Sequence, residues 1–192
     1  MRVITKEQKA KAKSHLLYGE TQTGKTTLIG LLARAHYNAT GKITRLILCD
    51  EGGPSAIQPE IDAGIVEVVD LVGDSMPQSN LMLLAAGKWP GPTGVIDQKS
   101  TLPNNIGIIA LDSLSSAAAL VMNFFITQHI KISQEVVAPR EEQGLKFGVA
   151  APSHYGAVHG FILQLITQLS SLPVDMVLFT ALEAKSEDQI DK

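Results

Sequence analysis

The sequence has one cysteine, no long apolar run and no excess of basic charge, and each shortage excludes a class of protein. Because Cys49 stands alone, the chain can form neither an internal disulfide nor a cluster of cysteines around a metal ion. No apolar run approaches the roughly 20 residues that a membrane-spanning helix needs. The basic residues 1–14 are not followed by the apolar stretch of a secretory signal. We therefore expect a cytoplasmic protein that does not contact a membrane.

The charge balance argues against a protein that coats nucleic acid through bulk electrostatics, because the net charge is −3. Two interpretations of the basic residues 1–14 stay open. They form an arm that contacts a phosphate backbone or a neighbouring subunit, or they are a solvated lead-in to the first strand. A chain of 192 residues suits one well-buried domain. We predict a basic N-terminal arm over residues 1–14 and a single core over residues 15–192.

Apolar runs with strand character alternate with segments of helical periodicity along most of the chain. The predicted strands are 15–18, 45–49, 66–72, 106–111 and 175–181. The predicted helices are 25–37, about 55–63, 79–86, 113–130 and 154–171. Most of the strand runs are continuously apolar, which is typical of a parallel sheet covered on both faces. We predict an α/β fold, a three-layer sandwich around a mainly parallel sheet.

The most specific feature is a complete G-x-x-x-x-G-K-[ST] motif, the phosphate loop or Walker A motif, between the first strand and the first helix. Its glycines permit a tight turn whose backbone N–H groups point at a phosphate, and the helix N-terminus adds partial positive charge. In this motif the lysine reaches the β- and γ-phosphates and the last hydroxyl holds Mg²⁺. The predicted ATP-binding residues are Gly19, Glu20, Thr21, Gln22, Thr23, Gly24, Lys25, Thr26 and Thr27.

A second element of a nucleotide site is the apolar run 106–111, which ends in Asp112 in the manner of a Walker B strand. In a parallel sheet the carboxyl end of this strand lies next to the phosphate loop. Asp112 would there bind Mg²⁺, directly or through its water, together with Thr26. The alternative interpretation is that Asp112 caps the N-terminus of the following helix.

The residue after Asp112 is Ser113, where many ATPases have a glutamate that polarises the attacking water, so a base must come from another strand. The strand 45–49 offers one, because it ends in the acidic pair Asp50 and Glu51. A phosphate loop, a strand ending in an acidic pair and an aspartate followed by serine together resemble the RecA-type recombinase ATPase core. The short form resembles the phage-encoded RecA-like ATPases, which include single-strand annealing recombinases.

The resemblance covers residues 16–183 and implies specific roles at the site. Glu51 would be the catalytic base that activates water, with Lys25 as the catalytic cation. The family's sensing strand ends in a polar residue that contacts the γ-phosphate. Thr180 and Glu183 are the candidates here, because Leu182 stands where a polar group is expected. The family has further strands beyond this one, so a chain that stops at Lys192 is either truncated or a minimal version.

As a function, the resemblance implies Mg²⁺-dependent ATP binding and hydrolysis in phage or bacterial DNA recombination, replication or packaging. The location would be the host cytoplasm if the chain is phage-encoded. Recombinases carry a DNA-contacting loop where this chain has the polar segment 131–153. Its positive charges are Lys131, Arg140 and Lys146 alone. Binding of single-stranded DNA would therefore need a homo-oligomer that repeats the patch.

Two other functions share the phosphate loop. A small-molecule or nucleotide kinase would close an arginine-bearing lid over the donor, and Arg140 is the lone lid candidate among four arginines. A nucleotide-binding assembly subunit would use its ATP state to set partner contacts, with little turnover.

Overall fold

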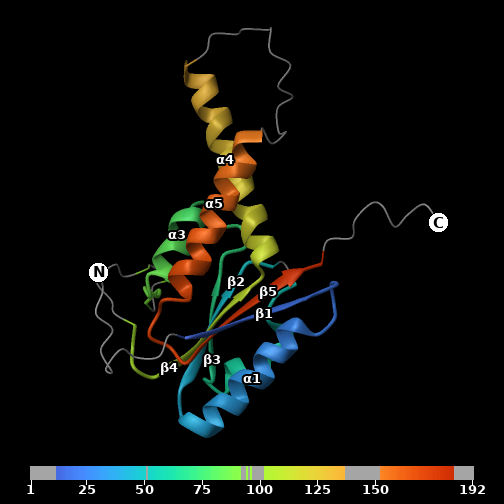
Figure 1. Cartoon of the computed structure of the whole chain (residues 1–192), viewed down its shortest axis with the longest axis vertical. Coiled ribbons are helices and arrows are strands. Elements are labelled where there is room, and N and C mark those ends of the chain that lie inside the picture. Colours follow the sequence, from blue (N-terminus) through green and yellow to red (C-terminus); the bar gives the residue numbers. More distant parts are fainter. Residues whose placement is uncertain are drawn as a thin grey trace, which may run out of the picture.

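The computed structural model describes residues 12–50, 52–91, 94, 96, 102–136 and 152–183 (Figure 1). Its strands are β1 (Lys13–Gly19), β2 (Ile43–Leu48), β3 (Val66–Asp70), β4 (Ile106–Asp112) and β5 (Met176–Leu182). Its helices are α1 (Lys25–Thr40), the 3-10 helix η1 (Ser55–Ile57), α2 (Gln58–Asp62), α3 (Pro77–Ala85), α4 (Leu114–Val136) and α5 (Pro152–Leu169). All the predicted strands and helices are present, with shifts at their ends.

Two predicted boundaries were wrong in an informative way. The helix expected over 55–63 is split into η1 and the short α2. The polar segment 131–153 was expected to be a loop throughout, but α4 continues to Val136 and α5 already begins at Pro152. Between 131 and 136 the sequence has no glycine or proline to end a helix. Proline is favoured in the first turn of a helix, where its missing N–H costs nothing.

The strands form one parallel sheet in the order β1-β5-β4-β2-β3. The strand that ends in Asp112, β4, is the central one, and every residue of it is buried. Because all the strands run in one direction, their carboxyl ends share one edge of the sheet. The phosphate loop after β1, Asp112 at the end of β4 and the last residues of β5 therefore come together. The predicted α/β fold with a parallel sheet is confirmed.

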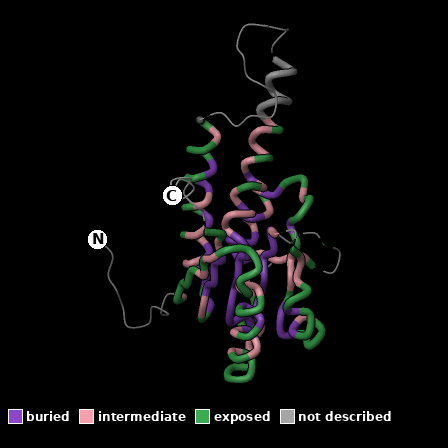
Figure 2. The backbone as a smooth tube through the Cα atoms, turned by 90° about the vertical axis from the view of Figure 1, so that its right-hand side faces the viewer, coloured by how far each residue is buried: buried purple, intermediate pink, exposed green. Residues whose placement is uncertain are grey.

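Helices cover the sheet on both faces, as the three-layer prediction requires (Figure 1). Successive residues of a strand point to opposite faces, so β2, β3, β4 and β5 each contribute to two cores. Figure 2 shows the buried residues gathered in the sheet between the helices. The core shared with α1 and η1 includes Ile29, Ala33, Leu46, Ile57, Ile108, Ala110 and Leu178. The core shared with α3, α4 and α5 includes Ile47, Leu81, Ile109, Leu111, Val121, Leu165, Val177 and Phe179.

The first strand departs from the expected coverage. β1 forms one edge of the sheet and pairs, within the described residues, with β5 alone. Its apolar side chains Leu16 and Tyr18 are 55% and 70% exposed. The prediction of a sheet covered on both faces is therefore wrong for β1, although its assignment as a strand is right.

The helix that follows the phosphate loop is fixed along its length by small residues and a glycine stop. Gly30 faces η1 so closely that a Cβ atom there would lie 2.6 Å from Cγ2 of Ile57. At the far end, Gly41 adopts a left-handed conformation with φ of 72° and donates its N–H to the carbonyl of Tyr37 at 2.8 Å. A glycine in this conformation is a common end of a helix.

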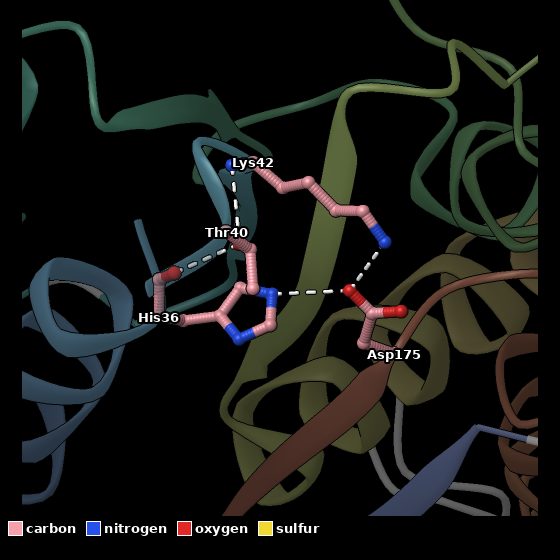
Figure 3. Close-up of polar contacts among 4 residues, drawn as sticks. All are labelled: His36, Thr40, Lys42 and Asp175. Atoms are coloured by element: carbon pink, nitrogen blue, oxygen red, sulfur yellow. Dashed lines mark hydrogen bonds and ion pairs between the residues drawn. The ribbon is translucent and has the colours of Figure 1, made fainter. Parts of the chain in front are cut away.

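A group of polar residues connects the C-terminal end of α1 to the start of β5 (Figure 3). Oδ2 of Asp175 accepts from Nζ of Lys42 at 2.6 Å and lies 3.1 Å from Nε2 of His36. The backbone N–H of Asp175 donates to the carbonyl of Gly107 in β4 at 2.9 Å. A side chain at Gly107 would overlap the His36 ring, so glycine is needed for this close approach. We call His36, Lys42 and Asp175 together the α1 clasp.

The contact with Lys42, with a smaller contribution from His36, holds the pKa of Asp175 below its usual value of 3.8. A carboxylate whose pKa is lowered by folding stabilises the protein above the unfolded pKa, and that contribution is lost as the pH falls through the folded value. The Asp175 side chain is 42% exposed, so solvent screens the pair.

We predict that Asp175→Asn lowers the free energy of unfolding by about 0.5–1 kcal/mol at neutral pH, the scale of an exposed ion pair. The difference from the parent should shrink as the pH is lowered below about 4, because the parent then loses the charge as well. Urea unfolding at the two pH values measures both effects. Asp62→Asn is the control, since exposed Asp62 contacts uncharged Gln58. A deficit that persists unchanged in acid would contradict the electrostatic role of Asp175.

Candidate nucleotide site

The phosphate loop connects the end of β1 to the start of α1 in a conformation that leaves its backbone open. Gly24 lies at the helix N-cap with φ of 82°, and Gln22 has φ of 63°, a left-handed value that costs a side-chain-bearing residue free energy. No side chain caps the helix and no acidic residue lies in its first turn. The first N–H groups of α1 are therefore left for an anion.

Most side chains of the loop are exposed to solvent. Thr21, Gln22, Thr23 and Thr27 are exposed, and Thr23 Oγ1 donates to the Glu20 carbonyl at 2.8 Å. The Lys25 ammonium folds back onto the start of the loop, where it donates to the carbonyls of Gly19 at 3.1 Å and Glu20 at 2.7 Å. The positive charge is thus held beside the open N–H groups of the helix.

Thr26 and Asp112, which are 86 positions apart in the sequence, are in direct contact. Thr26 Oγ1 donates to Oδ2 of Asp112 at 2.6 Å. Asp112 is 3% exposed, and a buried carboxylate needs such hydrogen bonds. The fold therefore brings together the two residues that the sequence predicted as Mg²⁺ ligands.

The other carboxylate oxygen of Asp112 is also occupied. Thr180 Oγ1 donates to Oδ1 at 2.5 Å, and Thr180 is fully buried. The structure thus places Thr180 at the site, in contact with the aspartate; its contact with a nucleotide stays a prediction. Glu183, the other candidate from the sensing strand, is exposed beside the loop.

The cap of α4 is Ser113 and not Asp112. Ser113 Oγ accepts the N–H of Ser116 at 3.1 Å, while the Asp112 carboxylate points to Thr26 and Thr180. The alternative interpretation of Asp112 as a helix cap is therefore wrong. The peptide bond between Asp112 and Ser113 is cis.

A cleft of about 570 Å³ adjoins the loop on the side of the exposed strand β1. Part of its lining is apolar and comes from Leu16, Tyr18 and Leu28. The polar part comes from the loop, including Lys25, and from Glu183. The site thus offers an apolar wall next to a phosphate-binding turn.

Several predicted residues fall outside the described part of the chain. Glu51, the predicted base, is one of them; so are Arg140, Lys146 and the side chain of Lys131, on which the DNA and kinase interpretations rest. Asp50, the neighbour of Glu51, is described: it is half-buried, and its Oδ1 accepts the N–H of Gly52 at 3.3 Å.

One contact at the site had no signal in the sequence analysis. Ser115 Oγ, in the first turn of α4, accepts the N–H of Leu182 at the end of β5 with a length of 3.0 Å. Neither residue belongs to a motif. The contact depends on the strand register, which can be predicted only when the order of the strands in the sheet is known.

The donor set at Thr26 and Asp112 fits Mg²⁺. A hydroxyl and a carboxylate are hard oxygen donors, the type that Mg²⁺ prefers. Within the described residues no group of three or more histidine, cysteine, aspartate or glutamate side chains could hold a metal ion. A cation here would thus rely on these two residues, water and bound phosphate.

No described helix is long and apolar enough to cross a membrane.

Comparison with known proteins leaves the family open. No protein family and no curated protein matches the sequence. Among solved structures, the chain is similar to a KaiC-like protein from the hyperthermophilic archaeon Pyrococcus horikoshii, with 16% sequence identity and a TM-score of 0.48. The match covers 90% of this chain and 62% of that one.

Cys49 follows the last residue of β2 and lies beside Asp112, to whose carbonyl its N–H donates at 2.7 Å. Burial, followed by the negative charges of Asp112, Asp70 and Asp50, raises the pKa of its thiol to about 12. Both causes disfavour the thiolate. Cys49 therefore behaves as a small buried apolar residue.

We predict that Cys49 in the folded chain does not react with Ellman's reagent at pH 8, since only about one thiol in ten thousand would be ionised. Labelling should follow unfolding in urea. The stability linked to this thiol is fully present below the unfolded value of 9.0 and is lost as the pH rises toward 12. Cys49→Ala should therefore flatten the alkaline loss of stability. Rapid labelling of the native chain would contradict the prediction.

Proposed function

We propose that this chain is a RecA-like ATPase that binds ATP with Mg²⁺ and hydrolyses it. The observation that carries the proposal is the contact of Thr26 with Asp112 at 2.6 Å beside an uncapped helix N-terminus. Two hard oxygen donors and a phosphate-binding turn, supplied by distant parts of the sequence, meet at one edge of the sheet. If the loop were only a flexible glycine turn with no role in nucleotide binding, nothing would explain why a buried carboxylate lies next to it.

In the proposed site each described residue has a distinct task. The loop and the first turn of α1 bind the phosphates through backbone N–H groups. Lys25 adds positive charge at the β- and γ-phosphates. Thr26 and Asp112 hold Mg²⁺, which when bound neutralises charge on the transferring phosphate. The apolar wall of Leu16, Tyr18 and Leu28 lies where the nucleoside can pack.

Hydrolysis further needs a group that orients and deprotonates water. Ser113, the residue after Asp112, bears no carboxylate and is bonded to the first turn of α4. We assign the base to Glu51, on the strength of its place after β2 and of the family resemblance. Asp50 supports the turn through its bond to Gly52.

The process that uses the ATPase is proposed from the sequence alone. We assign it to phage or bacterial DNA recombination, replication or packaging in the cytoplasm. Single-stranded DNA would be the partner and a homo-oligomer the active form, because one copy offers few cations in segment 131–153. A kinase would instead transfer phosphate to a metabolite, and an assembly subunit would bind ATP without turnover.

We predict that Lys25→Ala weakens binding of a fluorescent ATP analogue by about 10- to 100-fold, the scale of lost charge-assisted hydrogen bonds. ATP hydrolysis should fall with it, while thermal unfolding changes little because the ammonium lies outside the core. Lys13→Ala, at an exposed lysine at the other end of β1, is the matched control. Unchanged affinity in folded Lys25→Ala would contradict the assignment of the loop.

The same assay with and without single-stranded DNA separates the candidate functions. Stimulated hydrolysis supports the DNA-linked ATPase. Phosphate transfer to an added metabolite supports the kinase, and binding without turnover supports the assembly subunit.

We predict that Glu51→Gln keeps Mg²⁺-dependent ATP binding but lowers hydrolysis about a hundredfold or more, because glutamine cannot accept the proton from water. Single-turnover kinetics separate binding from the chemical step. Asp50→Asn is the neighbouring comparison and should retain most of the activity. If Glu51→Gln hydrolyses ATP at the parental rate, the base is another residue, with Asp50 or Glu183 next to be tested.

A further inference from the structure

Thr180 is a buried threonine whose hydroxyl contacts the carboxylate of Asp112, the proposed Mg²⁺ ligand. Its side chain is 0% exposed, and Oγ1 donates to Oδ1 of Asp112 at 2.5 Å. Thr26 donates to the opposite oxygen, Oδ2, at 2.6 Å. The Asp112 carboxylate is therefore held by two hydroxyl groups, one on each oxygen.

The sheet itself fixes this arrangement. β4 and β5 run in parallel with Leu111 beside Phe179, so one residue further along both strands Asp112 and Thr180 are neighbours. Both belong to the set of alternate residues, with Ala110 and Leu178, that face α1. The bond from the Leu182 N–H to Ser115 Oγ secures the end of β5 just beyond. Thr180 is thus placed by secondary structure and not by a mobile loop.

The two hydroxyls are not equivalent in chemistry. A hydroxyl has one donor hydrogen and two lone pairs, so Thr26 can donate to Asp112 and still present oxygen to a cation. Thr180 has no exposed surface, and within the described part of the chain its hydroxyl hydrogen-bonds to the Asp112 carboxylate alone. Without it, one oxygen of a buried carboxylate would lack a partner, and the group would be free to rotate about its Cβ–Cγ bond.

We infer that Thr180 is a positioning residue, which orients the Asp112 carboxylate for Mg²⁺ without touching the nucleotide. The inference rests on the proposed function. It differs from the sequence-based expectation that Thr180 contacts ATP, because it assigns the effect of Thr180 to the metal and not to the nucleotide. Removing the hydroxyl should then leave Mg²⁺-free nucleotide binding intact and reduce the gain that Mg²⁺ gives.

The test compares Thr180→Val, which removes the hydroxyl at nearly constant size, with Thr180→Ser, which keeps it. Affinity for a fluorescent ATP analogue is measured in EDTA and across a Mg²⁺ titration. We expect Thr180→Val to bind as the parent does in EDTA and to need about tenfold or more Mg²⁺ for half-maximal effect, the scale of one hydrogen bond to a charged group. Thr180→Ser should restore most of the Mg²⁺ response.

Thr44 in β2 supplies a matched control, because it is also a fully buried strand threonine. Within the described residues its Oγ1 has no hydrogen-bond partner. Thr44→Val should therefore leave both nucleotide and Mg²⁺ binding unchanged. Thermal unfolding of every variant shows whether a change in binding comes from a loss of fold.

If Thr180→Val does not fold, Thr180→Ala and Thr180→Ser are compared, since they differ by the hydroxyl oxygen. In an Asp112→Asn background the loss of the hydroxyl should have little further effect on the Mg²⁺ response, because Thr180 acts through Asp112.

An unchanged Mg²⁺ response in folded Thr180→Val would overturn the inference, and so would an equal loss of binding in EDTA and in Mg²⁺. Both results leave the proposed function standing. Failure of the parental chain to bind the analogue in either condition would overturn the proposed function, and the inference with it.

Discussion

The buried carboxylate of Asp112 is the point on which the candidate site depends. It joins the start of α1 through Thr26 and the end of β5 through Thr180, and its own strand is the centre of the sheet. A carboxylate with 3% exposure is costly unless it is hydrogen-bonded. Of the two partners that offset this cost, Thr26 would itself bind the cation, and Thr180 holds the carboxylate that binds it. Stability and function are thus coupled at one side chain, and a change there affects both.

The α1 clasp complements this contact at the opposite end of the helix. Thr26, in the first turn of α1, is bonded to the end of β4, and His36, near the last turn, lies against Asp175 just before β5. Helix α1 is therefore attached at both ends to the two central strands of the site. Close packing of Gly30 on Ile57 holds its middle. The orientation of the helix N-terminus, on which phosphate binding depends, is set by these contacts along its whole length.

The sequence predicted the elements better than the contacts between them. Alternating apolar runs were enough for the strands and helices, and the phosphate loop and Asp112 were identified by motif and by position after a strand. The bond between Thr180 and Asp112 could not be found in this way, because it depends on β5 lying beside β4 in one particular register. The same holds for His36 and Asp175, which contact each other across Gly107.

Exposure of β1 was missed for a related reason. The apolar run from His15 to Tyr18 has the same composition whether or not another strand lies beside it. Helix α4 extended beyond its predicted end because the sequence lacks a stop there, whereas the polar composition of 131–136 had suggested a loop. Composition indicates which conformation a segment prefers, and tertiary contacts determine which conformation it adopts.

Because β1 lies at the edge of the sheet, the two halves of the site are expected to differ in the free energy of local opening. Backbone amides exchange with solvent through local openings, and these require least free energy where a strand is exposed and paired on one side. Asp112 stands on the fully buried β4, whereas the phosphate loop grows from β1, which is bonded to β5 alone within the described residues. We therefore expect the backbone amides of the half that would hold the cation to exchange more slowly than those of the half that would hold the phosphates.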